Sequence, residues 1–220
     1  AYMYLFHPQI TKTIDLIKEN EIGEILSMET YFGNNILTKK KWFGLVKKKK
    51  IDPKNRIYNK KMGGGVILDL GCYPATFSSQ IASLKSPISF KNIQFKNIHN
   101  ILGSTGVEVD SYATLKFEND FVSKIGVSFA KNLGRKSVII GSKGKIIIED
   151  TWTAKPSKVI LKKKNNELVF NFESDKSIYS YEIELLSKFL LDQHFKNNQI
   201  YTIDKSILNM QIIDRWKRDI

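Results

Sequence analysis

Residue types that build metal sites and nucleophiles are scarce in this chain. Its 220 residues include a single cysteine, Cys72, which excludes an internal disulfide and any zinc site made of cysteines. No histidine or arginine near Cys72 in the sequence would activate it, so a small buried thiol is expected. The three histidines have no carboxylates spaced around them as metal ligands, and no metal is expected.

Long apolar runs are also missing. No stretch of eighteen apolar residues occurs, so no membrane-spanning helix is expected. The first residues, AYMYLFHPQ, have neither the basic start nor the cleavage site of a secretion signal. Together with the single cysteine, this predicts a cytoplasmic location. Apolar residues still make up 42% of the chain, which is enough for the core of one domain.

Acidic residues are also scarce. The chain has 22 of them against 35 lysines and arginines, which gives a net charge of +13. The excess lies between residues 39 and 61, where ten lysines and Arg56 face only Asp52, a net charge of +10. Either the run from Lys47 to Lys50 is a solvated loop, or it attracts an anionic substrate or a cofactor phosphate. Nucleic acid is not expected, since surface aromatics are not interleaved and no known module is present.

Hydrophobic periodicity and turn residues predict the elements. A strand is expected over residues 1–6, a helix after Pro8, and a strand over 24–32. A long basic loop follows over 33–62, and a helix then runs from the glycines to about residue 84. Further strands are expected over 88–98, 107–117, 121–129, 137–140, 145–149, 159–163 and 167–172. Final helices are expected over 180–196 and from Asp204, as a cap, to Trp216.

This order predicts one α+β domain over residues 1–220, with a large, mainly antiparallel, open-faced sheet and helices packed on one face. The other face then meets water or a partner. Apolar strand residues suggest that it is not fully solvated, and a dimer formed sheet to sheet is expected. The residues behind this expectation are Tyr112, Leu115, Phe117, Val127 and Phe129.

Residues 63–74 read GGGVILDLGCYP, and here glycines lead directly into an apolar segment. No GxGxxG or GxxxxGK[ST] pattern occurs, so Gly63, Gly64 and Gly65 are better explained by a sharp turn and the close approach of a ligand or neighbouring domain than by a phosphate loop. Asp69 and Tyr73 are spaced i, i+4 on one helix face, and Pro74 disturbs the helix.

Each of these side chains also has an ordinary structural explanation. Tyr73 can be a core residue and Asp69 a cap. As a proton donor, a tyrosine with a pKa near 10 needs a cation or a hydrogen-bond network to lower that value, and no lysine nearby is placed to do so. His7, between Phe6 and Pro8, is either a half-buried structural residue or a ligand contact.

Several ordered segments together resemble the C-terminal domain of the Gfo/Idh/MocA family of oxidoreductases. They are MYLFHPQ, NEIGEILSMETYFG, NKKMGGGVILDLGCYP, VDSYATLKFEND and IIGSKGKIII, and they span nearly all of the chain. The resemblance is greatest to the members that oxidise sugars and diols and carry Tyr after the Asp-x-Gly-x motif.

The resemblance implies an enzyme that interconverts a sugar-like alcohol and its ketone with NAD or NADP. By motif position, Tyr73 is the proton donor and acceptor, and Asp69 holds the substrate or orients the site. Trp42 and Phe43 lie where relatives have substrate-loop residues, and His7 is expected to contact substrate. The open sheet of relatives often forms a dimer, and the lysine-rich segment suggests an anionic substrate such as a sugar phosphate, a nucleotide sugar or a sugar acid.

The sequence also departs from the family pattern. The N-terminal Rossmann domain is absent from these residues, and with it the lysine of a Glu-Lys-Pro motif that works beside the tyrosine. Leu5 replaces an arginine that many relatives carry. This chain alone is therefore expected to bind no cofactor and to be inactive. The alternative is a non-enzymatic binding or scaffold protein that has lost its cofactor domain.

Overall fold

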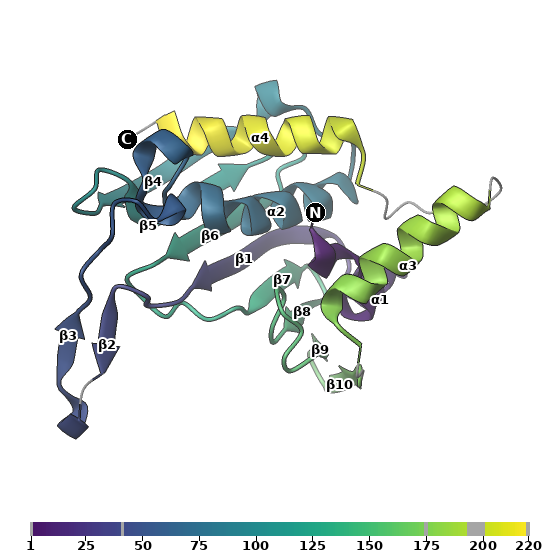
Figure 1. Cartoon of the computed structure of the whole chain (residues 1–220). Coiled ribbons are helices and arrows are strands. Elements are labelled where there is room, and N and C mark those ends of the chain that lie inside the picture. Colours follow the sequence, from purple (N-terminus) through teal and green to yellow (C-terminus); the bar gives the residue numbers. More distant parts are fainter. Residues whose placement is uncertain (1, 41, 174–175, 193–200, 219–220) are drawn as a thin grey trace.

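The computed structural model describes residues 2–40, 42–173, 176–192 and 201–218 of the chain (Figure 1). Eight strands form one sheet in the order β10-β9-β8-β7-β1-β6-β5-β4. Within the described residues, β1 and β6 are the one parallel pair of this sheet. The strands are β1 (Ile25–Gly33), β4 (Gln94–Leu102), β5 (Glu108–Lys116), β6 (Val122–Ser128), β7 (Ser137–Gly141), β8 (Gly144–Ile148), β9 (Lys158–Lys163) and β10 (Asn166–Asn171).

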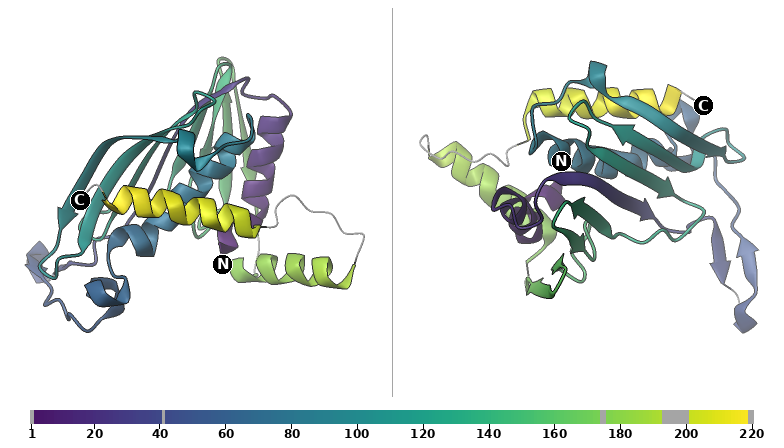
Figure 2. Two further views of the ribbon diagram at one scale, coloured as in Figure 1. Left: turned by 90° about the horizontal axis from the view of Figure 1, so that it is seen from above. Right: turned by 180° about the vertical axis from the view of Figure 1, so that it is seen from behind.

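Helices α1 (Pro8–Lys18), α2 (Cys72–Ser83) and α4 (Ile203–Arg218) lie on one face of this sheet, and the opposite face is bare (Figure 2). Helix α3 (Ile178–Leu191) extends past the edge of the sheet and packs against a short 3-10 helix at Met3–Phe6. The predicted α+β fold, with a mainly antiparallel sheet and one-sided helices, is therefore confirmed.

The hydrophobic core lies between the sheet and these helices. Side chains alternate between the two faces along each strand. Met28 of β1 and Ile125 of β6 are buried, whereas their chain neighbours Glu29 and Lys124 are on the bare face. By the same alternation, four of the residues taken to cover the bare face belong to the core instead: Leu115, Phe117, Val127 and Phe129. Only Tyr112 of that set is on the bare face.

The predicted long loop over residues 33–62 is wrong in part, because the segment contains a two-stranded antiparallel hairpin. Its strands are β2 (Thr38–Lys40) and β3 (Val46–Lys48), joined through a short turn at Trp42–Gly44. Figure 1 shows this hairpin projecting from the body beyond the end of β1. Consecutive lysines replace the alternation of apolar and polar residues that normally indicates a strand, so the composition of the segment predicted a loop.

Other boundaries also differ from the prediction. Residues 3–6 form a 3-10 helix and not a strand, because their aromatic side chains are buried without a strand partner. β4 begins at Gln94, after a 3-10 turn at Phe90–Asn92. Asp204 lies in the first turn of α4 and is not its cap. The predicted helical residues 193–196, and Ala1, lie outside the described residues. No helix in the described ranges is both long and apolar enough to cross a lipid bilayer.

Candidate active site

The glycine turn before α2 is shaped by this chain's own backbone. Gly63 and Gly65 have φ values of +73° and +116°, which favour glycine. A Cβ on Gly64 would lie 2.7 Å from the carbonyl oxygen of Arg56 and 2.8 Å from the backbone nitrogen of Asn59. The close approach that these glycines permit is therefore made within the chain.

The same turn does not form a phosphate cradle. Its three N–H groups donate to the carbonyl oxygens of Lys60, Asn59 and Ile57, at 3.3, 2.8 and 2.9 Å. A cradle needs N–H groups that point at the ligand. The described residues also contain no strand, glycine loop and helix in the order that binds a dinucleotide. They do not fit a nicotinamide cofactor by themselves.

The segment that follows is an irregular helix. A π-helical turn covers Ile67–Gly71, and α2 continues from Cys72. Pro74 lies in the first turn of α2, where its missing N–H is not needed. Such π-turns are frequent at functional sites because they re-aim side chains. Here Asp69 pairs with a neighbouring loop, whereas Tyr73 enters an aromatic cluster.

Tyr73 is half-buried among aromatic rings that come from three parts of the chain. Its ring centroid lies 5.4 Å from Phe32, 5.7 Å from Tyr4 and 6.0 Å from Trp152. Tyr2 adds an edge contact at 6.1 Å, and the Tyr4 hydroxyl donates to the Tyr73 carbonyl oxygen at 3.1 Å. These contacts hold the backbone and ring of Tyr73 in place.

Burial, with smaller contributions from the nearby Cys72, Tyr179 and Asp69, raises the pKa of Tyr73 to about 12. The phenol is therefore protonated at neutral pH and can donate its proton. In the described residues we find no cation among the main influences on its pKa.

Asp69 forms an ion pair with Arg56, at 2.9 Å between carboxylate and guanidinium. Its side chain is 22% exposed, so the pair is open to the surface on the Arg56 side. Arg56 begins a 3-10 turn capped by the side chain of Asn55. The lysine-rich segment thus supplies the ion-pair partner of Asp69, and that partner is the segment's one arginine.

His7 caps helix α1. Its Nδ1 accepts a hydrogen bond from the backbone N–H of Gln9 at 3.3 Å, so the proton of the neutral ring is on Nε2. Burial lowers the pKa of His7 to about 4, which keeps the ring neutral at pH 7. Its edge packs on Tyr181 at 4.9 Å. His7 therefore has a structural role as a cap, and its ring also lines a cavity, so its contact with substrate stays a prediction.

That cavity, which we call the cationic cavity, has a volume of about 490 Å³. It lies between the end of β10, the loop after β8 and the start of α3. Among its described lining residues are three cations and no acid. The lining consists of His7, Arg135, Thr153, Ala154, Lys155, Phe172, Lys176, Ser177, Ile178 and Tyr179. Tyr179 connects it to Tyr73, since its phenol is close enough to raise the Tyr73 pKa.

The structure does not bring Trp42 and Phe43 to this site. They lie at the tip of the β2–β3 hairpin, 86% and 91% exposed, with their rings stacked on each other at 6.2 Å. The lysines that follow, Lys47–Lys50, are exposed as well. Their assignment as substrate contacts stays a prediction that nothing in this chain's own packing supports.

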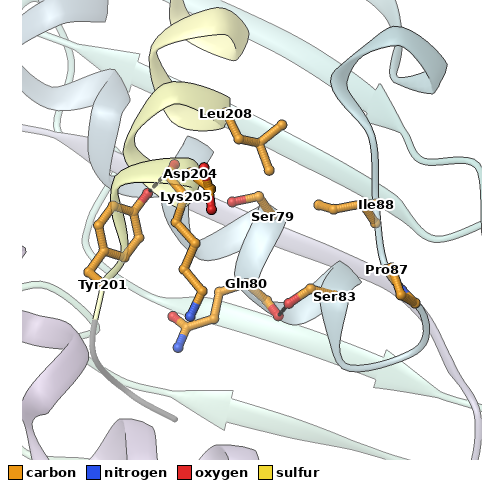
Figure 3. A pocket seen from close by; sticks show the side chains of 9 residues that line it. All are labelled: Ser79, Gln80, Ser83, Pro87, Ile88, Tyr201, Asp204, Lys205 and Leu208. Carbon is orange, nitrogen blue, oxygen red and sulfur yellow. Dashed lines mark hydrogen bonds between the residues drawn. The ribbon is translucent and has the colours of Figure 1, made fainter.

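A second cavity, of about 320 Å³, lies between the end of α2 and the start of α4 (Figure 3). Its lining combines apolar side chains with polar ones, and burial lowers the pKa of one of them, Lys205. The lining consists of Ser79, Gln80, Ser83, Pro87, Ile88, Tyr201, Asp204, Lys205 and Leu208. Tyr201 borders it and also packs on Tyr2 at 5.1 Å.

Sequence reasoning missed several residues of the site. Tyr2, Trp152 and Tyr179 are distant in sequence from Tyr73 and meet it only through tertiary packing. Arg135 did leave a signal, because it is one of only four arginines in a chain whose other basic residues are lysines. Arginine is the residue of choice for paired and anion-binding positions.

Comparisons with known proteins agree with this geometry. Residues 10–147 match the profile of the GFO/IDH/MocA C-terminal domain. A dTDP-3,4-didehydro-2,6-dideoxy-alpha-D-glucose 3-reductase from Saccharopolyspora spinosa is 25% identical over 69% of this chain and 40% of its own length. A trans-1,2-dihydrobenzene-1,2-diol dehydrogenase from Xenopus tropicalis is 24% identical over 97% of this chain and 60% of its own length.

A similar fold occurs in the crystal structure of KijD10, a 3-ketoreductase from Actinomadura kijaniata in complex with NADP and TDP-benzene. The TM-score is 0.74, with 18% identity over 99% of this chain and 60% of that one. The chain thus spans about two fifths to three fifths of the length of the relatives it matches. Because the family profile covers most of its residues, the chain belongs to the GFO/IDH/MocA family and corresponds to its C-terminal domain.

Proposed function

We propose that this chain is the substrate-binding half of an NAD(P)-dependent oxidoreductase that interconverts a sugar- or polyol-like alcohol and its ketone. The observation that carries the proposal is the Tyr73 phenol, held by aromatic rings beside the cationic cavity. Family membership supports it, as do relatives named as reductases and dehydrogenases. The rest of the relatives' length leaves room for a separate cofactor domain.

The role of Tyr73 follows from its protonation state. In the reducing direction, the substrate oxygen gains negative charge and the neutral phenol of Tyr73 donates its proton to that oxygen. A pKa near 12 suits the donor but not the reverse reaction, in which the phenolate must accept a proton. A cation from outside the described residues is therefore needed to lower the pKa. A nicotinamide cofactor, bound elsewhere in the protein, supplies or accepts the hydride.

Asp69 orients the site in this proposal. Its ion pair with Arg56 fixes the loop that precedes the glycine turn, and its 22% exposure leaves an oxygen for a substrate hydroxyl. Asp69→Asn keeps the shape of the side chain and removes its charge. We expect a higher KM with a smaller change in kcat, which steady-state kinetics can separate.

The test of the proposed function is Tyr73→Phe in the full-length protein. Removing the hydroxyl leaves the aromatic contacts in place, so Tm should change little. We expect kcat to fall by about 10²–10⁴, the usual contribution of a general acid. NAD(P)H oxidation with candidate ketoses would measure it. Unchanged turnover would show that Tyr73 only packs, whereas no turnover by the wild-type protein would favour the alternative of a binding or scaffold protein.

The cofactor requirement has a separate test. Because the described residues lack a dinucleotide cradle, the 220-residue chain alone should neither retain NAD(P)H nor reduce a ketose. Fluorescence titration of NADH or NADPH, with the full-length protein as the positive control, would detect binding. Turnover by the chain alone would refute the division of labour between the two halves.

We also propose that the bare face of the sheet forms a homo-oligomer. One cross-strand row on this face is apolar through β10 to β7 and ends in an ion pair across β1 and β6. In order, the row contains Val169, Ile160, Ile147, Val138, Glu29 and Lys124. Ile147→Lys should shift the protein to monomers. A wild-type monomer at micromolar concentration in sedimentation velocity would exclude the oligomer.

A further inference from the structure

We propose that the cationic cavity binds a phosphate or diphosphate group of the substrate, which places the neighbouring sugar at Tyr73. The inference rests on the proposed function and adds a substrate class to it. Phosphate could reach such a site on the substrate or on a dinucleotide cofactor, and the geometry favours the substrate. Thr153 of the cavity wall follows Trp152, whose ring packs against Tyr73, whereas the N–H groups of the glycine turn are engaged in hydrogen bonds within the chain.

Arg135 is the most specific feature of the cavity. Its Nη1 donates to the Asp150 carboxylate at 3.2 Å and to the Thr153 hydroxyl at 2.9 Å. Arg135 lines the cavity and both bonds use the same nitrogen, so the other N–H groups of its guanidinium have no hydrogen-bond partner among the described residues. A fork fixed in this way is suited to bidentate binding of phosphate.

The negative charge of Asp150 does not cancel this effect. Asp150 is buried behind the cavity wall and is not part of the lining. Its carboxylate also accepts hydrogen bonds from the Thr153 hydroxyl at 2.6 Å, the Thr153 N–H at 2.8 Å and the Trp152 N–H at 3.2 Å. Asp150 therefore serves as an anchor for Arg135 and for the loop after β8.

Other groups complete an environment for an oxyanion. Lys155 and Lys176 line the same cavity, and Lys176 also pairs with Glu184 at 2.7 Å. The Nε2–H of His7 is a neutral donor there, since Nδ1 is engaged with Gln9. The N-terminus of α3 also lines the cavity, and the positive end of a helix dipole favours an anion.

The volume and position of the cavity agree with a phosphorylated sugar. About 490 Å³ exceeds what a phosphate alone requires and falls in the range of small-molecule sites. Thr153 follows Trp152, whose ring is 6.0 Å from the Tyr73 ring. The loop after β8 thus contributes Thr153 to the cavity and Trp152 to the aromatic cluster around Tyr73.

The lysines of the β2–β3 hairpin are a poorer fit for the same role. They carry more charge, but they are exposed on an element that projects from the body (Figure 1). Exposed lysines bind anions weakly because water and salt screen them. Lys155 and Lys176 of the cavity are exposed as well, so the difference between the two sites is Arg135. The hairpin contains no arginine, and its lysines do not border Tyr73. They supply a matched control, since Lys47→Gln removes one charge away from the cavity.

The test uses the full-length protein with inorganic pyrophosphate as the probe. We expect pyrophosphate to inhibit competitively against the sugar substrate. Arg135→Lys, which keeps a counterion for Asp150, and Lys155→Gln, which changes an exposed side chain, should each weaken pyrophosphate binding about tenfold or more. Lys47→Gln should leave it unchanged. Isothermal titration with the Tyr73→Phe protein measures binding without turnover, so this inference and the proposed function can fail separately.

Three results would overturn the inference. The first is no pyrophosphate binding to the wild-type protein. The second is equal binding by Arg135→Lys, Lys155→Gln and Lys47→Gln, which would assign the effect to general surface charge. The third is inhibition that competes with NAD(P)H and not with the sugar, which would assign the phosphate to the cofactor.

Discussion

Trp152→Phe should destabilise the protein strongly, because Trp152 is the centre of the aromatic cluster around Tyr73. Its side chain is fully buried, stacks on Phe32 at 5.8 Å and meets the edge of Tyr4 at 5.0 Å. Its indole N–H donates to the Tyr31 carbonyl oxygen at 2.8 Å. Phenylalanine keeps one ring but loses the second ring and the hydrogen bond.

The magnitude can be worked from these contacts. The lost hydrogen bond is worth about 1 kcal/mol. The removed ring leaves about 40 Å³ unfilled, which at about 24 cal/mol per Å³ costs about 1 kcal/mol. The lost burial of about 40 Å² of apolar area adds about 1 kcal/mol. A total near 3 kcal/mol corresponds to a fall in Tm of roughly 6–12 °C for a domain of this size.

The assay is thermal unfolding followed by circular dichroism, with Trp42→Phe as the control. Trp42→Phe makes the same chemical change at a position that is 86% exposed, so the Tm of this variant should stay within about 2 °C of the wild type. Equal Tm values for the two variants would refute the reasoning, because they would show that Trp152 is not held as the structure has it.

Three further predictions concern the glycine turn and two buried titratable groups. Gly64→Ala should cost about 1–3 kcal/mol, since its Cβ would meet the backbone of Arg56 and Asn59. Tm should fall more than in Gly63→Ala, where the nearest atom is 3.6 Å away and only the φ of +73° disfavours alanine. His7 has a pKa lowered to about 4, so between pH 6.5 and 4 the unfolded chain binds the extra proton and stability falls; His7→Asn, which can still cap α1, should show a smaller loss of Tm over this range, and an identical loss would contradict the burial of the ring. Burial raises the pKa of the Cys72 thiol to about 11, so iodoacetamide at pH 8 should modify the folded protein far more slowly than the unfolded one, and equal rates by mass spectrometry would show an exposed thiolate.

The sequence was most informative where local pattern and tertiary context agree. Strands β5 to β9 were predicted almost to their ends, because alternating apolar residues and short polar turns occur together there. The motif GGGVILDLGCYP was also informative, since glycines and a proline restrict the backbone directly. Tyr73 was identified as the proton donor only through the family resemblance, and its spacing to Asp69 left a core residue equally open.

The sequence was least informative about faces and distances. Leu115 and Tyr112 are both apolar strand residues, yet one is in the core and the other on the bare face, because a strand shows its alternation but not which side the helices will cover. The lysine-rich segment was expected to be a loop near the substrate, whereas it is a projecting hairpin. Charge composition does not report where a segment points.

By itself, the sequence determined an α+β domain with a largely antiparallel sheet, the glycine turn and the irregular helix that carries Asp69 and Tyr73. These features depend on side-chain periodicity and backbone restriction, which act over a few residues. Only the tertiary structure decided that β1 inserts beside β6 and that Trp152, Tyr2 and Tyr179 surround Tyr73. It alone placed Arg135 beside this cluster, because contacts between distant segments are selected by the packing of the whole core and leave little trace in local sequence.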